Sequence, residues 1–204
     1  KKIIVKNLVV ILIQNRNLKA DLPGFANFSL DRPLIMGIVN VTPDSFTDGG
    51  EFFGAEIAIE HGLKLIKDGA DILDIGGEST RPGAVPVDPC EEVKRVLPVI
   101  NELSKLGAVV SVDTRNASVM EQALEAGASI INDVSALEGI GSLEVAAKSG
   151  ASVILMHMNG DPTTMMSNTD YNDIVSEINN YFALRIEACV SEGIDLERIA
   201  IDPG

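Results

Sequence analysis

The stretch Gly69-Ala70-Asp71-Ile72-Leu73-Asp74-Ile75 decides the fold, because its glycine–alanine pair leads directly into a short apolar run. The same joint recurs at residues 127–134 (Gly-Ala-Ser-Ile-Ile-Asn-Asp-Val) and 150–156 (Gly-Ala-Ser-Val-Ile-Leu-Met). Glycine just past a last helical turn takes the left-handed conformation that ends a helix, and alanine leaves room for a tight turn. The three joints therefore predict consecutive helix-to-strand connections.

Around these joints, short apolar runs alternate with longer amphipathic segments. Continuous apolar strands are what a parallel sheet buried on both faces requires. The expected strands are 34–41, 72–75, 109–112, 129–134, 152–156 and 199–201. The expected helices are 55–68, 91–106, 117–126, 143–148 and 173–192.

Six such strand–helix units predict an α/β protein, a (β/α)8 TIM barrel with six of its eight βα units present. Each unit takes roughly 28 residues, and eight units would give the ~250 residues of a barrel. A doubly wound open sheet is the alternative, but no G-x-G-x-x-G follows the first strand. Residues 1–33 are expected to form an extension, a hairpin that closes the bottom of the barrel. Residues 34–204 form the domain, and we expect the natural protein to continue beyond it.

The composition limits the classes of binding partner and indicates the cellular compartment. A net charge of −14 argues against nucleic acid and anionic membrane surfaces as partners. Cys90 and Cys189 lie far apart without a CxxC pattern, which predicts reduced thiols in a cytoplasmic protein. The most apolar stretch, residues 3–13, is interrupted by Lys6 and Asn7 and is too short to cross a bilayer.

Polar side chains follow nearly every expected strand, at the end where barrel enzymes place their active sites. Burying one such group without a partner costs about 1–3 kcal/mol, so several together indicate a ligand or a dense network. Asp113, Asn132 and Asp202 among them lack the His and Cys content of a zinc site and suit a ligand rich in N–H donors, a pterin or a guanine. The full set of these polar residues is Asn40, Asp74, Asp113, Asn132, Asp133, His157 and Asp202.

Two long motifs resemble the dihydropteroate synthases, a pterin-binding TIM-barrel family. The first is Ile35-Met-Gly-Ile-Val-Asn-Val-Thr-Pro-Asp-Ser-Phe-Thr-Asp-Gly-Gly50, and the second is Asp74-Ile-Gly-Gly-Glu-Ser-Thr-Arg-Pro-Gly83. Shorter blocks at 111–114, 131–133, 155–158 and 202–204 match in the same order. The resemblance covers residues 28 to 204.

The resemblance implies a transferase that joins 6-hydroxymethyl-7,8-dihydropterin diphosphate to 4-aminobenzoate, giving 7,8-dihydropteroate and pyrophosphate. It implies a homodimer and a target of sulfonamides. Asp113 and Arg81 would be catalytic, the first opposing positive charge on the pterin methylene and the second stabilising pyrophosphate. By the same resemblance, Asp113, Asn132 and Asp202 line the pterin site, Thr80 and Arg81 meet diphosphate and aminobenzoate, and Asn40 binds Mg²⁺. Met156 is expected to be either a core residue or a wall of the pterin pocket.

Two alternatives remain open at this point. One is a pterin-binding methyltransferase domain, which shares the barrel but gives no reason for the two long motifs. The other is a truncated, non-catalytic pterin-binding module, since the family's later Ser-Arg-Lys and Arg-x-His motifs are not in these 204 residues. We therefore expect the chain alone to be inactive and marginally stable, because an open barrel exposes two edges.

The remaining polar residues have plainer interpretations. Loops 42–54 and 76–89 are rich in Gly and Pro, and we expect them to be mobile. His61 is expected to be a surface or packing residue, and His157 either a packing residue or a ligand contact. Asp133 is expected to bind a neighbouring backbone amide and Asp74 to orient loop residues. Asp170, Asp173 and Glu177 are typical of a solvated helix start.

Overall fold

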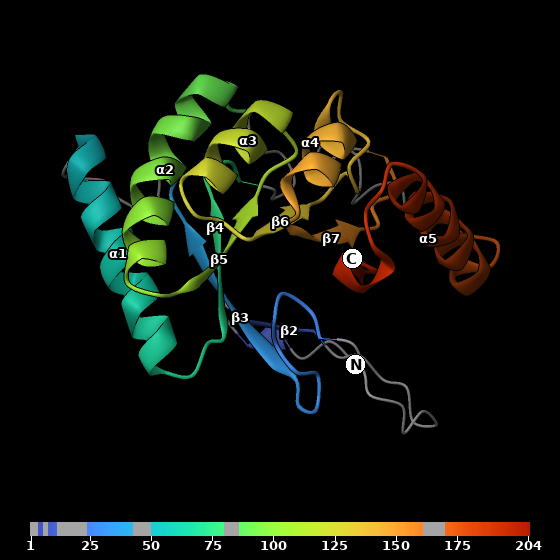
Figure 1. Ribbon diagram of the computed structural model, residues 1–204, viewed down its shortest axis with the longest axis horizontal. Helices are drawn as coiled ribbons and strands as arrows, with labels where there is room; N and C mark the ends of the chain where they lie inside the picture. Colours follow the sequence, from blue (N-terminus) through green and yellow to red (C-terminus); the bar gives the residue numbers. More distant parts are fainter. Residues whose placement is uncertain (1–3, 6–7, 12–23, 43–49, 80–85, 161–169) are drawn as a thin grey trace.

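Six parallel strands alternate with helices in the computed structural model, which describes residues 4–5, 8–11, 24–42, 50–79, 86–160 and 170–204 (Figure 1). In chain order the elements are β3 (Leu34–Asn40), α1 (Gly50–Lys67), β4 (Ile72–Gly76), α2 (Pro89–Lys105), β5 (Val109–Asp113), α3 (Ala117–Glu125), β6 (Ile130–Asp133), α4 (Ser142–Ser149), β7 (Ser152–Met156), α5 (Ile174–Ser191), the 3-10 turn η2 (Leu196–Arg198) and β8 (Ile199–Asp202).

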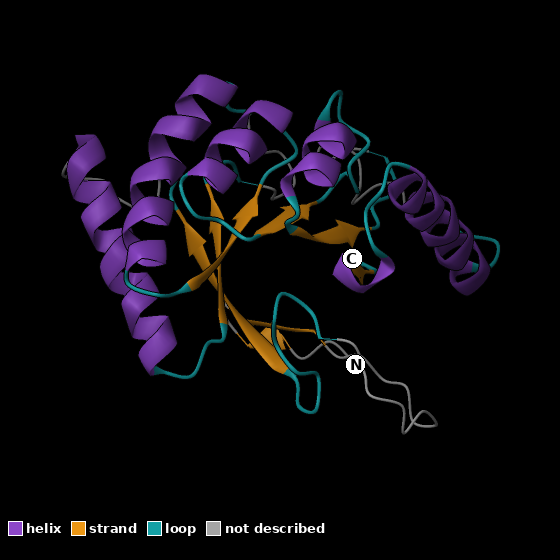
Figure 2. Cartoon of the chain, viewed as in Figure 1, coloured by secondary structure: helices purple, strands orange, loops and turns teal. Residues whose placement is uncertain are grey.

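The sheet follows chain order from β1 to β8 and curls, with the helices on its convex side (Figure 2). Neighbouring strands from β3 to β8 pair in parallel. Two further strands, β1 (Ile4–Val5) and β2 (Leu8–Ile11), pair antiparallel and continue the sheet beyond β3. The prediction of an α/β fold with six units of a (β/α)8 barrel is therefore confirmed.

The predicted helix-to-strand joints have the expected backbone. Gly69, Gly127 and Gly150 have φ values of +108°, +111° and +75°, in the left-handed region that ends a helix without steric cost to glycine. One boundary was wrong: α1 begins at Gly50, although the sequence predicted a loop through Gly54. A glycine costs a helix only about 1 kcal/mol, which the following turns offset by packing. Residues 43–49 of that loop and 80–85 of the next lie outside the described residues.

Alternate residues of each strand face two different cores. Leu73 and Ile75 of β4 face outward into the core shared with α1 and α2, and both are buried. On the concave side, Ile72 packs in a smaller cluster with Met36 and Phe25. Full burial of one such side chain contributes about 1.5–3 kcal/mol. The concave side is therefore apolar near the strand starts, and the polar residues lie nearer the strand ends.

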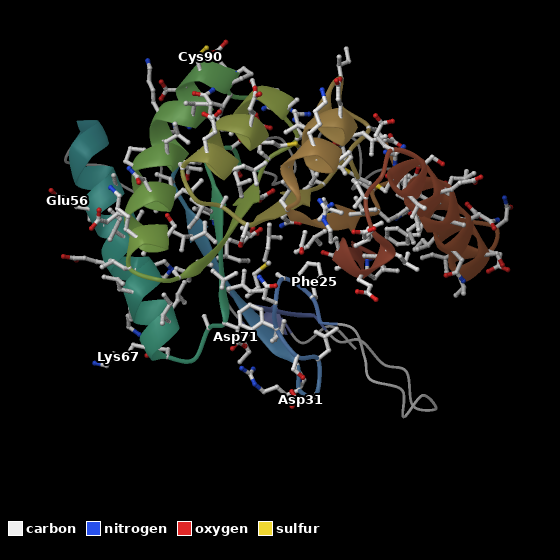
Figure 3. All side chains as sticks on the ribbon, viewed as in Figure 1. Phe25, Asp31, Glu56, Lys67, Asp71 and Cys90 are labelled. Atoms are coloured by element: carbon white, nitrogen blue, oxygen red, sulfur yellow. The ribbon has the colours of Figure 1, made fainter. Side chains whose placement is uncertain are left out.

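An ion pair between Arg32 and Asp71 holds the end of the molecule where the strands begin, and Figure 3 shows where Asp71 lies. The Asp71 carboxylate accepts from the Arg32 guanidinium at 2.8 and 2.6 Å and from the Ile35 backbone N–H at 2.9 Å. The hydrogen bond from Arg32 lowers the pKa of Asp71. This contact ties the segment before β3 to the loop that enters β4.

Two further predictions concern the cysteines and the membrane. Cys90 is exposed, Cys189 is buried, and both are free thiols, as the sequence predicted. No helix within the described ranges is long and apolar enough to cross a bilayer.

Candidate active site

Parallel pairing brings the predicted site residues to one end of the sheet. Asn40 of β3 is level with Gly76 of β4, Gly76 with Asp113 of β5, and Asp113 with Asn132 of β6. On the other side of the curl, Met156 of β7 is level with Asp202 of β8. Residues from positions 40 to 202 thus lie at the same end of the sheet, as expected for a barrel enzyme.

Gly76 occupies the middle of this row and leaves space between its neighbours. A Cβ at this position would lie 3.4 Å from Oδ2 of Asp113 and 3.7 Å from Oδ1 of Asn40. The two oxygens therefore flank the same small space. Any side chain larger than alanine at position 76 would occupy the space between these two oxygen atoms.

A second polar layer lies one step deeper on the concave side. Asp74, two residues before Gly76, is level with Ser111, two residues before Asp113. Asp74 is 5% exposed, and its Oδ2 accepts from Nδ2 of Asn132 at 2.9 Å. The sequence suggested that Asp74 orients loop residues, whereas the hydrogen bond that the structure describes for Asp74 is with Asn132 on a strand. Counting back two residues from Gly76 and Asp113 could have found this layer.

Several buried oxygen atoms that can accept hydrogen bonds lie in the site. Oδ1 of Asp74, Oγ of Ser111 and Oδ1 of Asp113 are buried and have no hydrogen-bond partner within the part of the chain described. Burial raises the pKa of Asp113 well above its usual value, and the negative charges of Asp74, Asp133, Glu92 and Glu78 raise it further. Burial also raises the pKa of Asp74, and the hydrogen bond from Asn132 partly opposes this rise. Such a site favours a ligand that brings N–H donors or positive charge.

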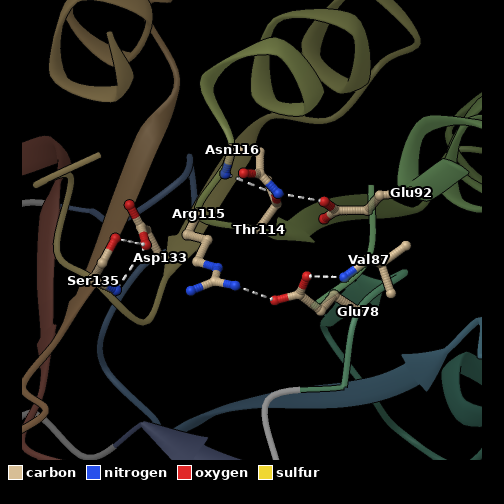
Figure 4. Close-up of polar contacts among 8 residues, drawn as sticks. All are labelled: Glu78, Val87, Glu92, Thr114, Arg115, Asn116, Asp133 and Ser135. Carbon is tan, nitrogen blue, oxygen red and sulfur yellow. Dashed lines mark hydrogen bonds and ion pairs between the residues drawn. The ribbon is translucent and has the colours of Figure 1, made fainter. Parts of the chain in front are cut away.

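Two carboxylates tie the loop after β4 and helix α2 to the loop after β5 (Figure 4). Glu78 binds the Arg115 guanidinium at 3.0 Å and accepts from the Val87 backbone N–H at 2.8 Å. Glu92 is fully buried, and its Oε2 accepts from Nδ2 of Asn116 at 2.7 Å. Burial raises the pKa of Glu92, and hydrogen bonds oppose this. These contacts fix the residues that immediately follow Asp113.

The sequence did not single out these two carboxylates. Glu92 falls on the buried stripe of α2 with Val96, Val99 and Leu103, so its helical spacing was the available signal. Glu78 lies within the second long motif, and the sequence does not show which residues of that motif have a structural role.

Asp133 has the structural role that the sequence suggested (Figure 4). It is fully buried; its Oδ1 accepts from the Ser135 backbone N–H at 2.7 Å, and its Oδ2 from that of Leu137 at 2.9 Å. Leu137 and the preceding Ala136 both have positive φ, which is costly for residues with a Cβ. The carboxylate therefore stabilises a strained turn after β6.

The other polar residues lie in packing or capping positions. The His157 ring packs edge-on against Tyr181 of α5, with ring centroids 5.0 Å apart, so it contacts a helix. His61 lies half-buried in α1. Asp173 caps α5 by accepting from the Ser176 backbone N–H at 3.2 Å, and Glu177 accepts from the Asp173 backbone N–H. Asp173 and Glu177 therefore belong to an exposed helix start, as predicted.

Asn40 offers an oxygen ligand of the kind that suits a magnesium ion. Asn40 is exposed at the end of β3, where its amide oxygen is available to a hard cation. No group of three or more His, Cys, Asp or Glu side chains suited to a metal occurs in the described ranges. Mg²⁺ needs only one or two protein oxygens when a substrate supplies phosphate. Thr80 and Arg81, the predicted diphosphate and aminobenzoate residues, lie outside the described residues.

Comparison with known proteins agrees with this geometry. A family model described as pterin binding enzyme matches residues 36–204. Dihydropteroate synthase of Neisseria meningitidis serogroup B is 49% identical over 184 residues, covering 89% of this chain and 65% of the relative. The Xanthomonas albilineans dihydropteroate synthase with 4-aminobenzoic acid superimposes with a TM-score of 0.80 at 49% identity, covering 87% of this chain and 63% of that one.

The same Xanthomonas enzyme in complex with 7,8-dihydropteroate has a TM-score of 0.75 at 47% identity, with 87% of this chain and 62% of that chain covered. The chain thus spans slightly less than two thirds of the length of these relatives. The family model, however, covers every polar strand end described above and all six parallel strands except the first two residues of β3. On sequence and structure together, this chain belongs to the pterin-binding enzyme family.

Proposed function

We propose that the complete protein is a dihydropteroate synthase. It condenses 6-hydroxymethyl-7,8-dihydropterin diphosphate with 4-aminobenzoate to give 7,8-dihydropteroate and pyrophosphate. The observation that carries the proposal is the level row of Asn40, Asp113 and Asn132 above buried, unpartnered acceptors. The relatives that share this chain's sequence at 47–49% identity are dihydropteroate synthases, two of their structures holding 4-aminobenzoic acid or 7,8-dihydropteroate.

The acceptors would bind the pterin ring through its N–H groups. A 2-aminopyrimidinone edge presents two adjacent donors, which one carboxylate accepts in a bidentate manner. Asp113 and Asp202 supply carboxylates, and Asn132 supplies both a donor and an acceptor. Met156, which is level with Asp202, would cover one face of the ring.

The same charges would favour the transition state. Breaking the C–O bond to the diphosphate places positive charge on the pterin methylene, delocalised into the ring. Positive charge beside Asp113 favours the ionised form of its buried carboxyl group. The carboxylate then opposes that charge from a position where electrostatic interactions are stronger than in water. The amine of aminobenzoate then forms the new C–N bond and loses its proton, and no protein nucleophile is required.

The leaving diphosphate needs positive charge, which Arg81 supplies in this proposal with Thr80 as a hydrogen-bond donor. Bound Mg²⁺ would supply further charge at the diphosphate, held by the Asn40 amide oxygen. We also propose a homodimer in the cytoplasm, which sedimentation of the complete protein and fractionation of cells would test.

Transfer of isotope-labelled 4-aminobenzoate into 7,8-dihydropteroate tests the proposed reaction. The complete protein should form labelled product, Asp113→Ala and Asn40→Ala should each lose at least about 100-fold in kcat/KM, and Glu144→Ala on the exposed face of α4 should be unaffected. No product from the complete protein would refute the proposal. Methyl transfer from a methylated folate would favour the methyltransferase alternative.

A further inference from the structure

The contact between Asp74 and Asn132 reaches across the concave side of the sheet. Asp74 and Ser111 are level on β4 and β5, and Ser111 is level with Ile130 of β6. Asn132 lies two residues beyond Ile130, so its side chain reaches diagonally down to Asp74 Oδ2 at 2.9 Å. Asp74 is 5% exposed and lies below the row that would contact the pterin.

This contact selects one orientation of a side chain that otherwise has two. The two ends of an asparagine amide have nearly the same shape, and hydrogen bonds decide which end points where. A carboxylate oxygen accepts hydrogen bonds, so it holds Nδ2 of Asn132 toward Asp74 and leaves Oδ1 directed away. The reverse orientation would oppose two acceptors at a buried position.

We propose that Asp74 is a positioning residue, which fixes the Asn132 amide so that its oxygen meets an N–H donor of the pterin ring. The inference rests on the proposed function, because Asn132 contacts the pterin in that proposal. A hydrogen bond to a carboxylate also polarises the amide and strengthens its oxygen as an acceptor. Asp74 thereby makes the site selective for a ring edge that presents a donor at this place.

The test compares Asp74→Ala with Asp74→Asn in the complete protein. The first removes the acceptor, whereas the second offers an amide oxygen to Nδ2 of Asn132 and keeps the geometry. Two readouts apply: proton exchange of the Asn132 side-chain NH₂ resonance by NMR, assigned by its absence in Asn132→Asp, and equilibrium binding of 6-hydroxymethylpterin. Glu92→Ala is the matched control, since it removes a similar buried carboxylate–amide contact at Asn116.

In Asp74→Ala the Asn132 NH₂ protons should exchange faster, and the pterin Kd should rise about tenfold, with a smaller change in kcat than in KM. Asp74→Asn should restore slow exchange and stay within about threefold of wild-type affinity. Glu92→Ala should leave the exchange rate of the Asn132 NH₂ protons unchanged.

Three results would overturn the inference. These are unchanged Asn132 exchange in Asp74→Ala, unchanged pterin affinity in that variant, or failure of Asp74→Asn to restore affinity while it restores the resonance. A wild-type protein that binds no pterin would instead refute the proposed function, and the resonance would still decide whether Asp74 holds Asn132.

Discussion

Replacing Asp113 by asparagine should stabilise the folded protein while it removes activity. Oδ1 of Asp113 is buried without a partner within the described part of the chain, and four other carboxylates raise the pKa of Asp113 beyond the effect of burial. An unsatisfied buried polar group costs about 1–3 kcal/mol, and more when it is charged. We therefore expect Asp113→Asn to raise the free energy of unfolding by about 1–3 kcal/mol at pH 7.

The pH dependence distinguishes this cause from a general packing change. The pKa of Asp113 is raised in the folded state, so the folded protein binds more protons than the unfolded chain between the two pKa values. Wild-type stability is fully present below the ordinary Asp pKa and falls as the pH rises through the folded value. The advantage of Asp113→Asn should therefore be small at low pH, grow through that window and then level off.

Urea unfolding across a pH series measures this, with a chelator and without substrate, so that only the carboxylates contribute. Asp71→Asn is the control of opposite sign. Arg32 lowers the pKa of Asp71, so that variant should be less stable than wild type at pH 7, and the difference should vanish as the pH falls through the lowered value. An Asp113→Asn protein that is less stable than wild type at pH 7, or a difference independent of pH, would refute the reasoning.

Three further outcomes are expected. Gly77→Ala should lower the free energy of unfolding by about 1–3 kcal/mol in urea, because the new Cβ would lie 2.8 Å from Cγ1 of Val96; wild-type stability would contradict the packing. Asp133→Ala should cost about 2–3 kcal/mol by thermal unfolding, because the turn at Leu137 loses its acceptor; an unchanged melting temperature would count against that role. Chelation should abolish turnover and Mg²⁺ restore it, and Asn40→Ala should need about tenfold more Mg²⁺ for half-maximal rate; equal requirements would exclude Asn40 as a ligand.

Much of the architecture could be predicted because its determinants are local. The Gly-Ala joints at 69, 127 and 150 specify their own backbone, and the apolar runs need no distant partner to be recognised as buried strands. The position of polar residues at strand ends follows from the same reasoning, since parallel strands end on one side. The sequence therefore predicted that Asn40, Asp113 and Asn132 lie at one end of the sheet, and the strand register agrees.

The start of α1 could not be read in the same way. Gly50 and Gly54 lower helix propensity, and only the packing of the turns after them offsets that loss. The contact between Asp74 and Asn132 could not be predicted either, because a carboxylate inside an apolar run has no partner nearby in the sequence. Its partner, Asn132, lies 58 residues away in the chain.

The sequence by itself determined the repeating βα units, the family and the set of polar residues at the strand ends, because periodicity and long motifs are properties of neighbouring residues. The tertiary structure decided which of those residues share a layer. Register places Asp74 beneath Asn132, and helix packing places Glu92 beside Asn116. Both contacts join separate βα units, and their energy depends on burial that exists only after the sheet has curled.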